Sequence, residues 1–266
     1  MKRSSPIKYF GGKNGFANKI LQYFPTNYQN ITYVEPFCGS AALLFHKERS
    51  KVEIINDLDN NIYSLFKVLI DENLFSKFKH MCDLTPYSET LLLEYKKDLS
   101  TEIDIVERAY KFFYCNRVSY NGLGGFSTSN VIRRNMSKSV SDYLSAIDGL
   151  FDIHNRLSGV IVHNTNALSL IEKWDKEEVF MYLDPPYALE TRSSGGYKHD
   201  MSDDDQDQFL STILNIKNAK VLISGYKCER YSILEKNGWK RIDMEIKTQN
   251  NNRKGKSKVE SLWFNY

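Results

Sequence analysis

Seven short apolar segments, most of them rich in β-branched residues, limit the folds open to this chain more than any other feature. Short segments that are apolar throughout are typical of strands buried on both faces of a sheet. Helical segments separate several of them, and this alternation predicts a doubly wound α/β domain. The predicted strands are Ile31–Phe37, Lys51–Asn56, Gly159–Asn164, Val179–Leu183, Lys220–Gly225, Trp239–Lys247 and Val259–Asn265.

One helix between these strands can be placed from its first residues. Ser202 followed three positions later by Asp205 has the pattern of a capping box, in which each side chain bonds the backbone of the other. We predict a helix from this point to about Ile216. Its apolar face is expected to lie on the sheet and to contain Phe209, Ile213 and Ile216.

The middle of the chain, residues 60–157, differs because no segment there has a clear strand pattern. Ser119–Asn130 is rich in glycine, serine and asparagine and is predicted to be a loop. The chain is therefore expected to have an α/β domain, residues 1–59 and 158–266, interrupted by a helical domain, residues 60–157. The helix faces predicted there contain Ile103, Val106, Tyr110 and Phe113, and then Tyr143, Ile147, Leu150 and His154.

The formal net charge is only +3, but the basic residues are sorted along the chain. Residues 1–34, 108–141 and 247–258 hold five, six and five lysines and arginines and no acidic residue. Chance clustering on solvated faces would account for one such window. Three of them favour a polyanionic partner that binds a basic surface of an otherwise acidic protein.

Cysteine and histidine usage argues against disulfides and metal. Four cysteines lie far apart without a Cys-x-x-Cys pair, which indicates reduced thiols, and the five histidines have no metal-binding spacing. No apolar run approaches the roughly 18 residues that a membrane span needs. Met1–Pro6 is not followed by an apolar core, so a signal peptide is not expected either, and a cytoplasmic protein is predicted.

The stretch Glu35–Leu43 ends one predicted strand, turns on Gly39 and enters a helix. A glycine lets the backbone approach a ligand closely, and α/β folds bind cofactors at the carboxyl ends of strands. This stretch has one glycine where a dinucleotide fingerprint has three, so pyrophosphate binding is not expected. A plain strand-to-helix turn would have the same pattern.

Two further motifs suit a nucleoside-like ligand. Asp57 follows the next strand, 18 residues after that glycine, where an acidic residue binds ribose hydroxyls in nucleoside-binding sheets. The alternative for Asp57 or Asp59 is a helix cap. In Lys8–Lys13, two glycines follow an aromatic pair, so Tyr9 could pack on a base and Lys13 could meet a carboxylate; an ordinary turn is the alternative.

Asp184-Pro185-Pro186-Tyr187 stands directly after the apolar segment Val179–Leu183. The exocyclic amine of adenine is a poor nucleophile because its lone pair is delocalised into the ring. Asp184 and the carbonyl of Pro185 can accept its two N–H groups, and the fixed φ of proline preorganises them. Tyr187 can stack on the base, which must first leave the duplex. The alternative is a surface turn with Tyr187 in the core.

In their order along the chain, these motifs resemble the Dam-type N6-adenine DNA methyltransferases, the D12 class or alpha group. The likeness includes Tyr9–Lys13, Glu35–Leu43, Asn56-Asp57, the helical insertion and Asp184–Tyr187, and so covers nearly the whole chain. It implies a Rossmann-like fold with a mixed seven-stranded sheet and a helical target-recognition domain. It also implies S-adenosylmethionine as methyl donor, S-adenosylhomocysteine as product, and no metal.

The resemblance assigns roles to individual residues. Asp57 would bind the ribose hydroxyls, and Asp184 would touch both the amino group of the cofactor and the target amine. Where the family has an aspartate at the cofactor adenine, this chain has Asn166, whose amide can still accept an amine proton. The residues so assigned to the cofactor are Tyr9, Lys13, Phe37, Gly39, Asp57, Leu58, Asn166, Ala167 and Asp184, and those assigned to catalysis are Asp184, Pro185, Pro186 and Tyr187.

The helical insertion resembles the target-reading domain of the family, with Asn116–Leu123 as its helix-to-loop segment. The likeness ends there, because Gly124–Ser129 replaces the family's Phe-Asn-x-Pro-Phe-Gly stretch, so recognition of GATC is not predicted. Arginine reads guanine edges well, and Arg133 or Arg134 is expected to do so. The predicted DNA contacts are Arg117, Tyr120, Asn121, Arg133, Arg134, Arg253 and Lys256.

Two segments near the predicted site have alternatives of their own. Thr191–His199 contains two adjacent glycines and could close over the flipped base, or it could be an ordinary connection. Asn250–Lys258 is basic and polar, which suits phosphate contacts that position the DNA, or a solvated hairpin.

The resemblance implies direct transfer of a methyl group to adenine in double-stranded DNA. One alternative is the same fold acting on RNA or on a protein glutamine. The three basic windows argue against a protein substrate. The other alternative is a non-catalytic DNA-binding relative, which the intact Asp184–Tyr187 motif disfavours.

Overall fold

The computed structural model describes residues 5–9, 11–122, 124–187, 200–246 and 258–266. The chain divides into two compact units, and each is described by itself. The first contains residues 1–17, 39–47 and 59–162, and the second contains residues 18–38, 48–58 and 163–266. This division groups residues 1–17 and 39–47 with the helical segment, whereas the sequence-based prediction places them with the sheet.

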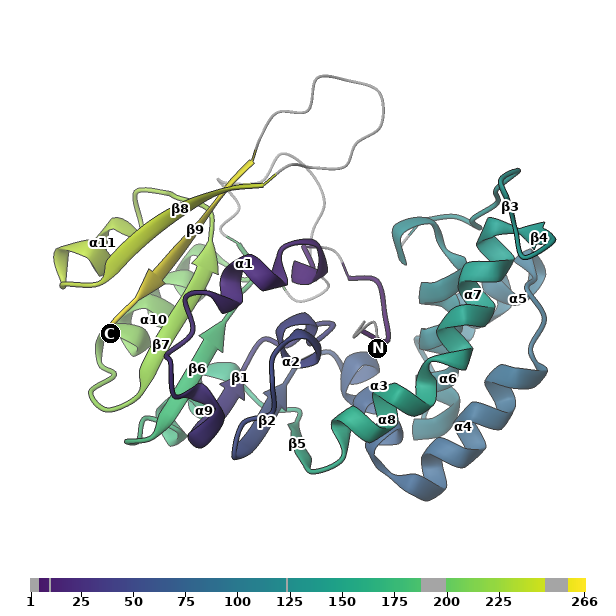
Figure 1. The fold of residues 1–266 in the computed structure, drawn as a ribbon, viewed down its shortest axis with the longest axis horizontal. Helices are drawn as coiled ribbons and strands as arrows, with labels where there is room; N and C mark the ends of the chain where they lie inside the picture. Colours follow the sequence, from purple (N-terminus) through teal and green to yellow (C-terminus); the bar gives the residue numbers. More distant parts are fainter. Residues whose placement is uncertain (1–4, 10, 123, 188–199, 247–257) are drawn as a thin grey trace. The chain divides into compact units, whose positions relative to one another are not determined.

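All seven predicted strands are present, in one sheet of order β5-β2-β1-β6-β7-β9-β8 (Figure 1). Their bounds differ from the predicted ones by at most two residues. The strands are β1 Thr32–Glu35, β2 Val52–Asn56, β5 Val160–His163, β6 Val179–Leu183, β7 Lys220–Gly225, β8 Lys240–Ile246 and β9 Lys258–Phe264. The mixed α/β sheet of the predicted fold class is thereby confirmed.

The sheet has a switch point beside β1. Strand β1 pairs in parallel with β2 on one side and with β6 on the other, and β6 pairs in parallel with β7. Connections that leave β1 and β6 in opposite directions open a crevice at the carboxyl ends of these strands, which is where open α/β sheets bind ligands. Strand β9 is antiparallel to both β7 and β8, so the sheet is mixed.

Helix α10, Asp203–Leu214, covers the core of the sheet unit. Ser202 and Asp205 form the predicted capping box, with each side chain bonded to the backbone of the other. Phe209 and Ile213 are buried in one cluster with strand residues such as Met181. Ile216 lies beyond the end of the helix and packs on this cluster only partly buried.

The remaining helices are short in the sheet unit and long in the helical segment. The part that the structure describes also contains 3-10 turns at Lys13–Gly15, Tyr28–Asn30 and Tyr120–Gly122. The helices are α1 Ala17–Leu21, α2 Ala42–His46, α3 Asn60–Ile70, α4 Glu72–Leu84, α5 Glu89–Asp98, α6 Ile105–Val118, α7 Lys138–Asp148, α8 Leu150–Leu157, α9 Ala167–Lys173 and α11 Ser232–Lys236. None of the helices in the described parts of the chain is long and apolar enough to cross a bilayer.

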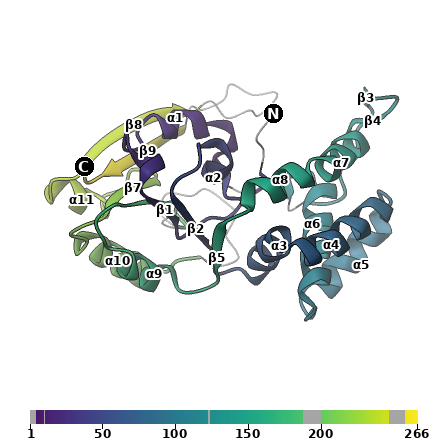
Figure 2. The same cartoon turned by 60° about the horizontal axis from the view of Figure 1, so that its bottom comes forward.

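Helix α6 is the centre of the helical bundle, and it packs against α3, α4 and α5 (Figure 2). Val106, Tyr110 and Phe113 are buried, as the helical spacing predicts. Aromatic rings fill the interior: Phe113 meets Phe78 edge to face, and Tyr110 meets Tyr95 in the same way. The insertion between β2 and β5 is mainly helical, as expected.

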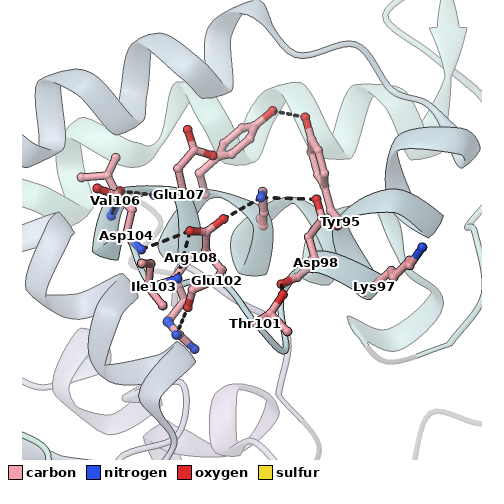
Figure 3. A network of polar contacts seen from close by, with 12 residues as sticks. Tyr95, Lys97, Asp98, Thr101, Glu102, Ile103, Asp104, Val106, Glu107 and Arg108 are labelled. Carbon is pink, nitrogen blue, oxygen red and sulfur yellow. Dashed lines mark hydrogen bonds and ion pairs between the residues drawn. The ribbon is translucent and has the colours of Figure 1, made fainter.

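Ile103 was predicted on the buried face of α6, and this is wrong, because it is 92% exposed and precedes the helix. Asp104 is the cap, and its carboxylate accepts hydrogen bonds from Val106 and Glu107 N–H groups. Figure 3 shows how the neighbouring Glu102 completes this corner: Oε1 accepts from the backbone of Ile103 and Asp104, and Oε2 receives the Lys111 ammonium at 2.7 Å. The polar corner therefore sets the start of the helix.

Two other parts of the insertion differ from the prediction. The apolar face from Tyr143 to His154 belongs to two helices, because the chain breaks at Gly149 between α7 and α8. Two-residue strands β3, Ile132–Arg133, and β4, Met136–Ser137, form a hairpin where no strand was predicted. Arg134 and Asn135 connect them with φ of 53° and 58°, and positive φ at both positions makes a tight hairpin turn.

Candidate active site

Asn56 joins three loops at the carboxyl edge of the sheet. Its buried amide nitrogen donates to the carbonyls of Pro36 at 2.9 Å and Thr165 at 3.1 Å, and its amide oxygen accepts from the Thr165 N–H at 2.9 Å. Its own carbonyl accepts from the Cys38 N–H. The loops after β1, β2 and β5 are therefore fixed by one side chain, and Phe37 lies between two of its contacts on the first loop.

The residues after β2 and β5 combine polar and apolar surface. Asp57 is half-buried, and its carbonyl accepts a hydrogen bond from Asn164. Leu58 is 54% exposed. Asn166 caps α9, since its amide oxygen accepts from the backbone of Leu168 and Ser169. Ala167, the first residue of α9, is partly exposed.

Asp57 and Asp59 divide the two roles open to them. Asp59 is the cap of α3, and its carboxylate accepts from the Asn61 N–H at 2.9 Å. A cap role was one of the alternatives for this motif, and the structure gives it to Asp59. Asp57 is therefore the member of the pair that is suited to a ligand at the end of β2.

The N-terminal motif and the glycine turn meet in the first unit. Gly39 has φ of +48°, and a Cβ atom placed there would lie 2.7 Å from Cε1 of Tyr9. The Tyr9 ring therefore packs directly on the glycine backbone, with no room for a side chain. Gly12 closes the turn by donating to the Tyr9 carbonyl at 3.0 Å. Lys13 is 3% exposed, and its ammonium donates to the Gly11 carbonyl.

Asn116, near the end of α6, binds the backbone of Lys8 in the same unit. Its amide oxygen accepts from the Lys8 N–H at 2.8 Å, and its amide nitrogen donates to the Lys8 carbonyl at 2.7 Å. Gly122 has φ of +84°, and a Cβ atom there would lie 2.9 Å from the Asn116 amide nitrogen. The helix-to-loop segment is thus joined to the N-terminal motif, a contact that the sequence pattern alone did not indicate.

The Asp184–Tyr187 motif begins at the residue after β6. Pro185 is buried and Pro186 is half-buried, and the Pro186 carbonyl accepts from the Gln206 amide at 2.7 Å. Gln206 belongs to α10 and is fully buried. Among the described residues, none donates a hydrogen bond to the carbonyl of Pro185. Helix α10 therefore fixes the motif through its second proline.

Asp184 is held by two hydroxyl groups that reach the same carboxylate oxygen. Ser224 Oγ donates to Oδ1 at 2.9 Å, and the Tyr187 hydroxyl donates to Oδ1 at 3.2 Å. Ser224 is fully buried on β7 and also bonds the Tyr182 hydroxyl at 2.7 Å. The carboxylate plane is thus fixed from β6, β7 and the motif itself.

Tyr187 is only 6% exposed, and the one hydrogen of its hydroxyl is shared between Asp184 Oδ1 and Oε1 of the buried Glu260 on β9. Its ring meets Tyr226 edge to face, with centroids 4.7 Å apart. Burial, and then the charges of Asp184 and Glu260, raise the pKa of Tyr187 well above its ordinary value. The phenol therefore keeps its proton and acts as a donor at physiological pH. Ser224, Tyr226 and Glu260 were not identified from the sequence.

Among the predicted DNA-binding residues, those of the β3–β4 hairpin are exposed. Ile132 is 77% exposed, and the Arg133 and Arg134 side chains are 49% and 56% exposed. Arg133 pairs with Asp142 at 2.5 Å, and Arg134 lies 3.8 Å from an Asp148 carboxylate oxygen. Such exposed ion pairs contribute little stability and are easily exchanged for phosphate.

The other predicted DNA-binding residues of the helical segment, Tyr120, Asn121 and Arg117, differ in exposure and in their contacts. Tyr120 is 67% exposed, and Asn121 has a positive φ of 52°. Arg117 instead donates to the backbone carbonyls of Ser5 and Pro6, and burial lowers its pKa to about 10. DNA contact by Arg117 stays a prediction, but the structure gives its guanidinium another task. Arg253 and Lys256, like Thr191–His199, lie outside the described residues.

The arrangement is that of a ligand-binding α/β protein with a carboxylate fixed at the switch point of its sheet. The family model of the D12 class N6 adenine-specific DNA methyltransferases matches residues 9–249. The chain belongs to this family, as the resemblance predicted, and it is an enzyme that methylates adenine in DNA. Membership implies S-adenosylmethionine as methyl donor and DNA as substrate.

Curated relatives agree with this assignment. The type II methyltransferase M.MjaIII of Methanocaldococcus jannaschii is 25% identical over 240 residues, which cover 82% of each chain. The type II methyltransferase M1.LlaDCHI of Lactococcus lactis is 27% identical and covers 73% of this chain and 69% of its own. The DNA adenine methylase of Escherichia coli is 22% identical and covers 70% of this chain and 66% of its own.

Proposed function

We propose that Asp184 and the Pro185 carbonyl accept the two N–H groups of an adenine amine that has been flipped out of double-stranded DNA. The observation that carries this proposal is the fixed Asp184 carboxylate, which Ser224 and Tyr187 both bond at Oδ1. Next to it stands a proline carbonyl with no donor among the described residues. Two preorganised acceptors suit an amine that must become tetrahedral as it reacts.

The residues at the carboxyl edge fit S-adenosylmethionine. The Asp57 carboxylate follows β2 and suits ribose hydroxyls, while the exposed Leu58 and the partly buried Leu168 offer apolar surface to a purine. Asn166 caps α9 and Ala167 is its first residue, and by position in the family pattern we assign both to the cofactor. By position in the family pattern we also assign Tyr9, Lys13, Phe37 and Gly39 to the cofactor. When bound, S-adenosylmethionine supplies an electrophilic methyl group on a sulfonium centre.

In this proposal the residues of the Asp184–Tyr187 motif act on the amine of the target adenine. Asp184 and Pro185 draw the amine hydrogens out of the ring plane, which frees the nitrogen lone pair for attack. Positive charge develops on the nitrogen, and the Asp184 side chain that accepts its hydrogen bond stabilises that charge. Tyr187, buried and hydrogen-bonded through its hydroxyl, forms a rigid wall beside the base.

For DNA binding we propose the exposed β3–β4 hairpin together with Tyr120. Arg134 projects from a tight turn, and Ile132 places apolar surface next to it. An arginine and an apolar side chain on a narrow hairpin suit base edges in a groove. Phosphate contacts by Arg253 and Lys256 remain a prediction from the sequence.

The experiment measures methyl transfer to unmethylated duplex DNA, followed by digestion and detection of N6-methyladenosine. Wild-type protein should methylate DNA, and Asp184→Ala should lose at least about a hundredfold in rate, as expected when a transition-state contact is removed. Asp204→Ala, an exposed carboxylate of α10, is the matched control and should keep the wild-type rate. Full activity of Asp184→Ala would contradict the assigned role, and transfer to RNA but not to DNA would contradict the substrate.

A further inference from the structure

Glu260 is a buried carboxylate for which the reaction described above has no use. It lies on β9, is 2% exposed, and receives the hydroxyl hydrogen bond of Tyr187 from 73 residues away in sequence. Two positions further along β9, on the same face of the strand, Leu262 is a fully buried apolar residue. Burying a carboxylate is costly unless hydrogen bonds compensate for the lost water, so an apolar residue would suit this strand position better for stability alone.

The contacts of Tyr187 connect Glu260 to the reacting carboxylate. The Tyr187 hydroxyl lies within hydrogen-bond distance of Glu260 Oε1 and, at 3.2 Å, of Asp184 Oδ1. The edge of the Tyr226 ring holds the Tyr187 ring in place. The hydroxyl can stay beside Asp184 only while its position is fixed, and the hydrogen bond to Glu260 contributes to fixing it.

We propose that Glu260 is a positioning residue for methyl transfer, and that it orients Asp184 through the Tyr187 hydroxyl. Ser224 donates to the same Oδ1 atom from β7, and this oxygen shares the Tyr187 hydrogen with Glu260. A Tyr187 hydroxyl that moved away from Oδ1 would therefore change the orientation of the carboxylate. The inference rests on the proposed function, since it assigns Asp184 to the target amine.

The test uses full-length protein and single-turnover methylation at saturating DNA and S-adenosylmethionine. Glu260→Met replaces the carboxylate with an apolar side chain of similar volume. The variant lacks the hydrogen-bond acceptor, but the sheet should still fold. We expect its single-turnover rate to fall about tenfold, as for loss of one hydrogen bond to a charged group. The affinities for DNA and S-adenosylhomocysteine should stay within about twofold of wild type.

Three further variants separate positioning from a merely structural role. Glu260→Gln keeps an acceptor oxygen and should restore the rate to within about threefold of wild type. In a Tyr187→Phe background, Glu260→Met should cost less than about twofold, because the hydroxyl through which it acts is gone. Glu245→Ala, an exposed carboxylate on the neighbouring β8, is the control and should keep the wild-type rate.

The outcomes are distinct. A wild-type protein that transfers no methyl group overturns the proposed function itself. With an active wild type, a Glu260→Met rate equal to that of the control overturns the positioning role. A full tenfold loss in the Tyr187→Phe background, or a loss that appears only in ligand affinity, overturns it as well.

Discussion

Asn116 and Lys8 form a closed pair of hydrogen bonds, of 2.8 and 2.7 Å, across 108 residues of sequence. The asparagine amide does for the Lys8 peptide group what a neighbouring strand would do, because it both accepts and donates. Lys8 is followed directly by Tyr9, whose ring packs on Gly39. The end of α6 therefore fixes the turn that carries the predicted cofactor residues of the first unit.

Asn116→Ala should lower the free energy of unfolding by about 2 kcal/mol, since the Lys8 N–H and the Lys8 carbonyl both lose this partner. Urea unfolding measures this change. Asn130→Ala, at an exposed loop position, is the matched control and should change stability by less than about 0.5 kcal/mol. Equal stability of the two variants would show that the backbone N–H and carbonyl of Lys8 find other hydrogen-bond partners.

Asn56→Ala should weaken the binding of S-adenosylhomocysteine. The variant frees the loops at Pro36 and Thr165, which flank the predicted cofactor surface. We expect the dissociation constant to rise about tenfold or more, because each buried amide bond contributes about 1 kcal/mol. Calorimetry measures the affinity, and unchanged binding would argue against a cofactor at this edge.

Gly39→Ala should be destabilising for two reasons that a second mutation can separate. The positive φ of 48° strains an alanine, and its Cβ would lie 2.7 Å from the Tyr9 ring. Tyr9→Ala removes the clash and leaves the strain, so the double variant should be less destabilised than the sum of the single ones. Thermal and urea unfolding of the four proteins give this comparison. Strict additivity would show that the ring moves aside without cost.

Arg134→Gly should weaken DNA binding without straining the hairpin, because glycine accepts the φ of 53°. If Arg134 contacts phosphate, the slope of log Kd against log salt should fall by about one. If it reads a base, affinity for the preferred site should fall while non-specific binding persists. Lys51→Ala, at the amino end of β2 and away from the ligand-binding edge, is the control. Unchanged binding of Arg134→Gly to all DNA would contradict a role for the hairpin.

Acid should destabilise the protein partly through His163, at the end of β5. Burial, assisted by the charge of Lys173, lowers the pKa of His163 below its ordinary value of 6.5. The unfolded chain then binds more protons, so this contribution to stability is complete above about pH 6.5 and is lost as the pH falls through that value. His163→Gln should therefore flatten the fall in unfolding free energy between about pH 7.5 and about pH 5.5. His80→Gln, on the exposed side of α4, should keep the wild-type dependence.

The sequence predicts those parts of the fold that depend on local pattern. Continuous burial makes Val179–Leu183 apolar throughout, and the Ser202–Asp205 capping box is made by two residues three positions apart. The start of α6 was missed at Ile103, because the polar corner of Glu102 and Asp104 outweighs apolar spacing. The β3–β4 hairpin was missed because two residues per strand are too few to show alternation.

In the site, the residues that could be predicted are those that stand in a short motif at the end of a strand, such as Asp184 and Asp57. The partners of Asp184 could not be predicted, because Ser224 lies 40 residues away and Glu260 reaches it through Tyr187. In a strand such as β9, a glutamate among apolar residues looks like a solvent-facing position. Its pairing with Met244 of β8 and its contact with Tyr187 place it inside.

The position of β9 also has a consequence for the order in which the protein can mature. The last strand in sequence is an interior strand, inserted between β7 and β8. Until it inserts, the peptide groups of β7 that face away from β6 lack their strand partner, and β7 forms an open apolar edge. A chain cut before Lys258 should therefore aggregate rather than persist as a weakly active enzyme, so proteolytic loss of this one strand would remove the protein and its methylation together.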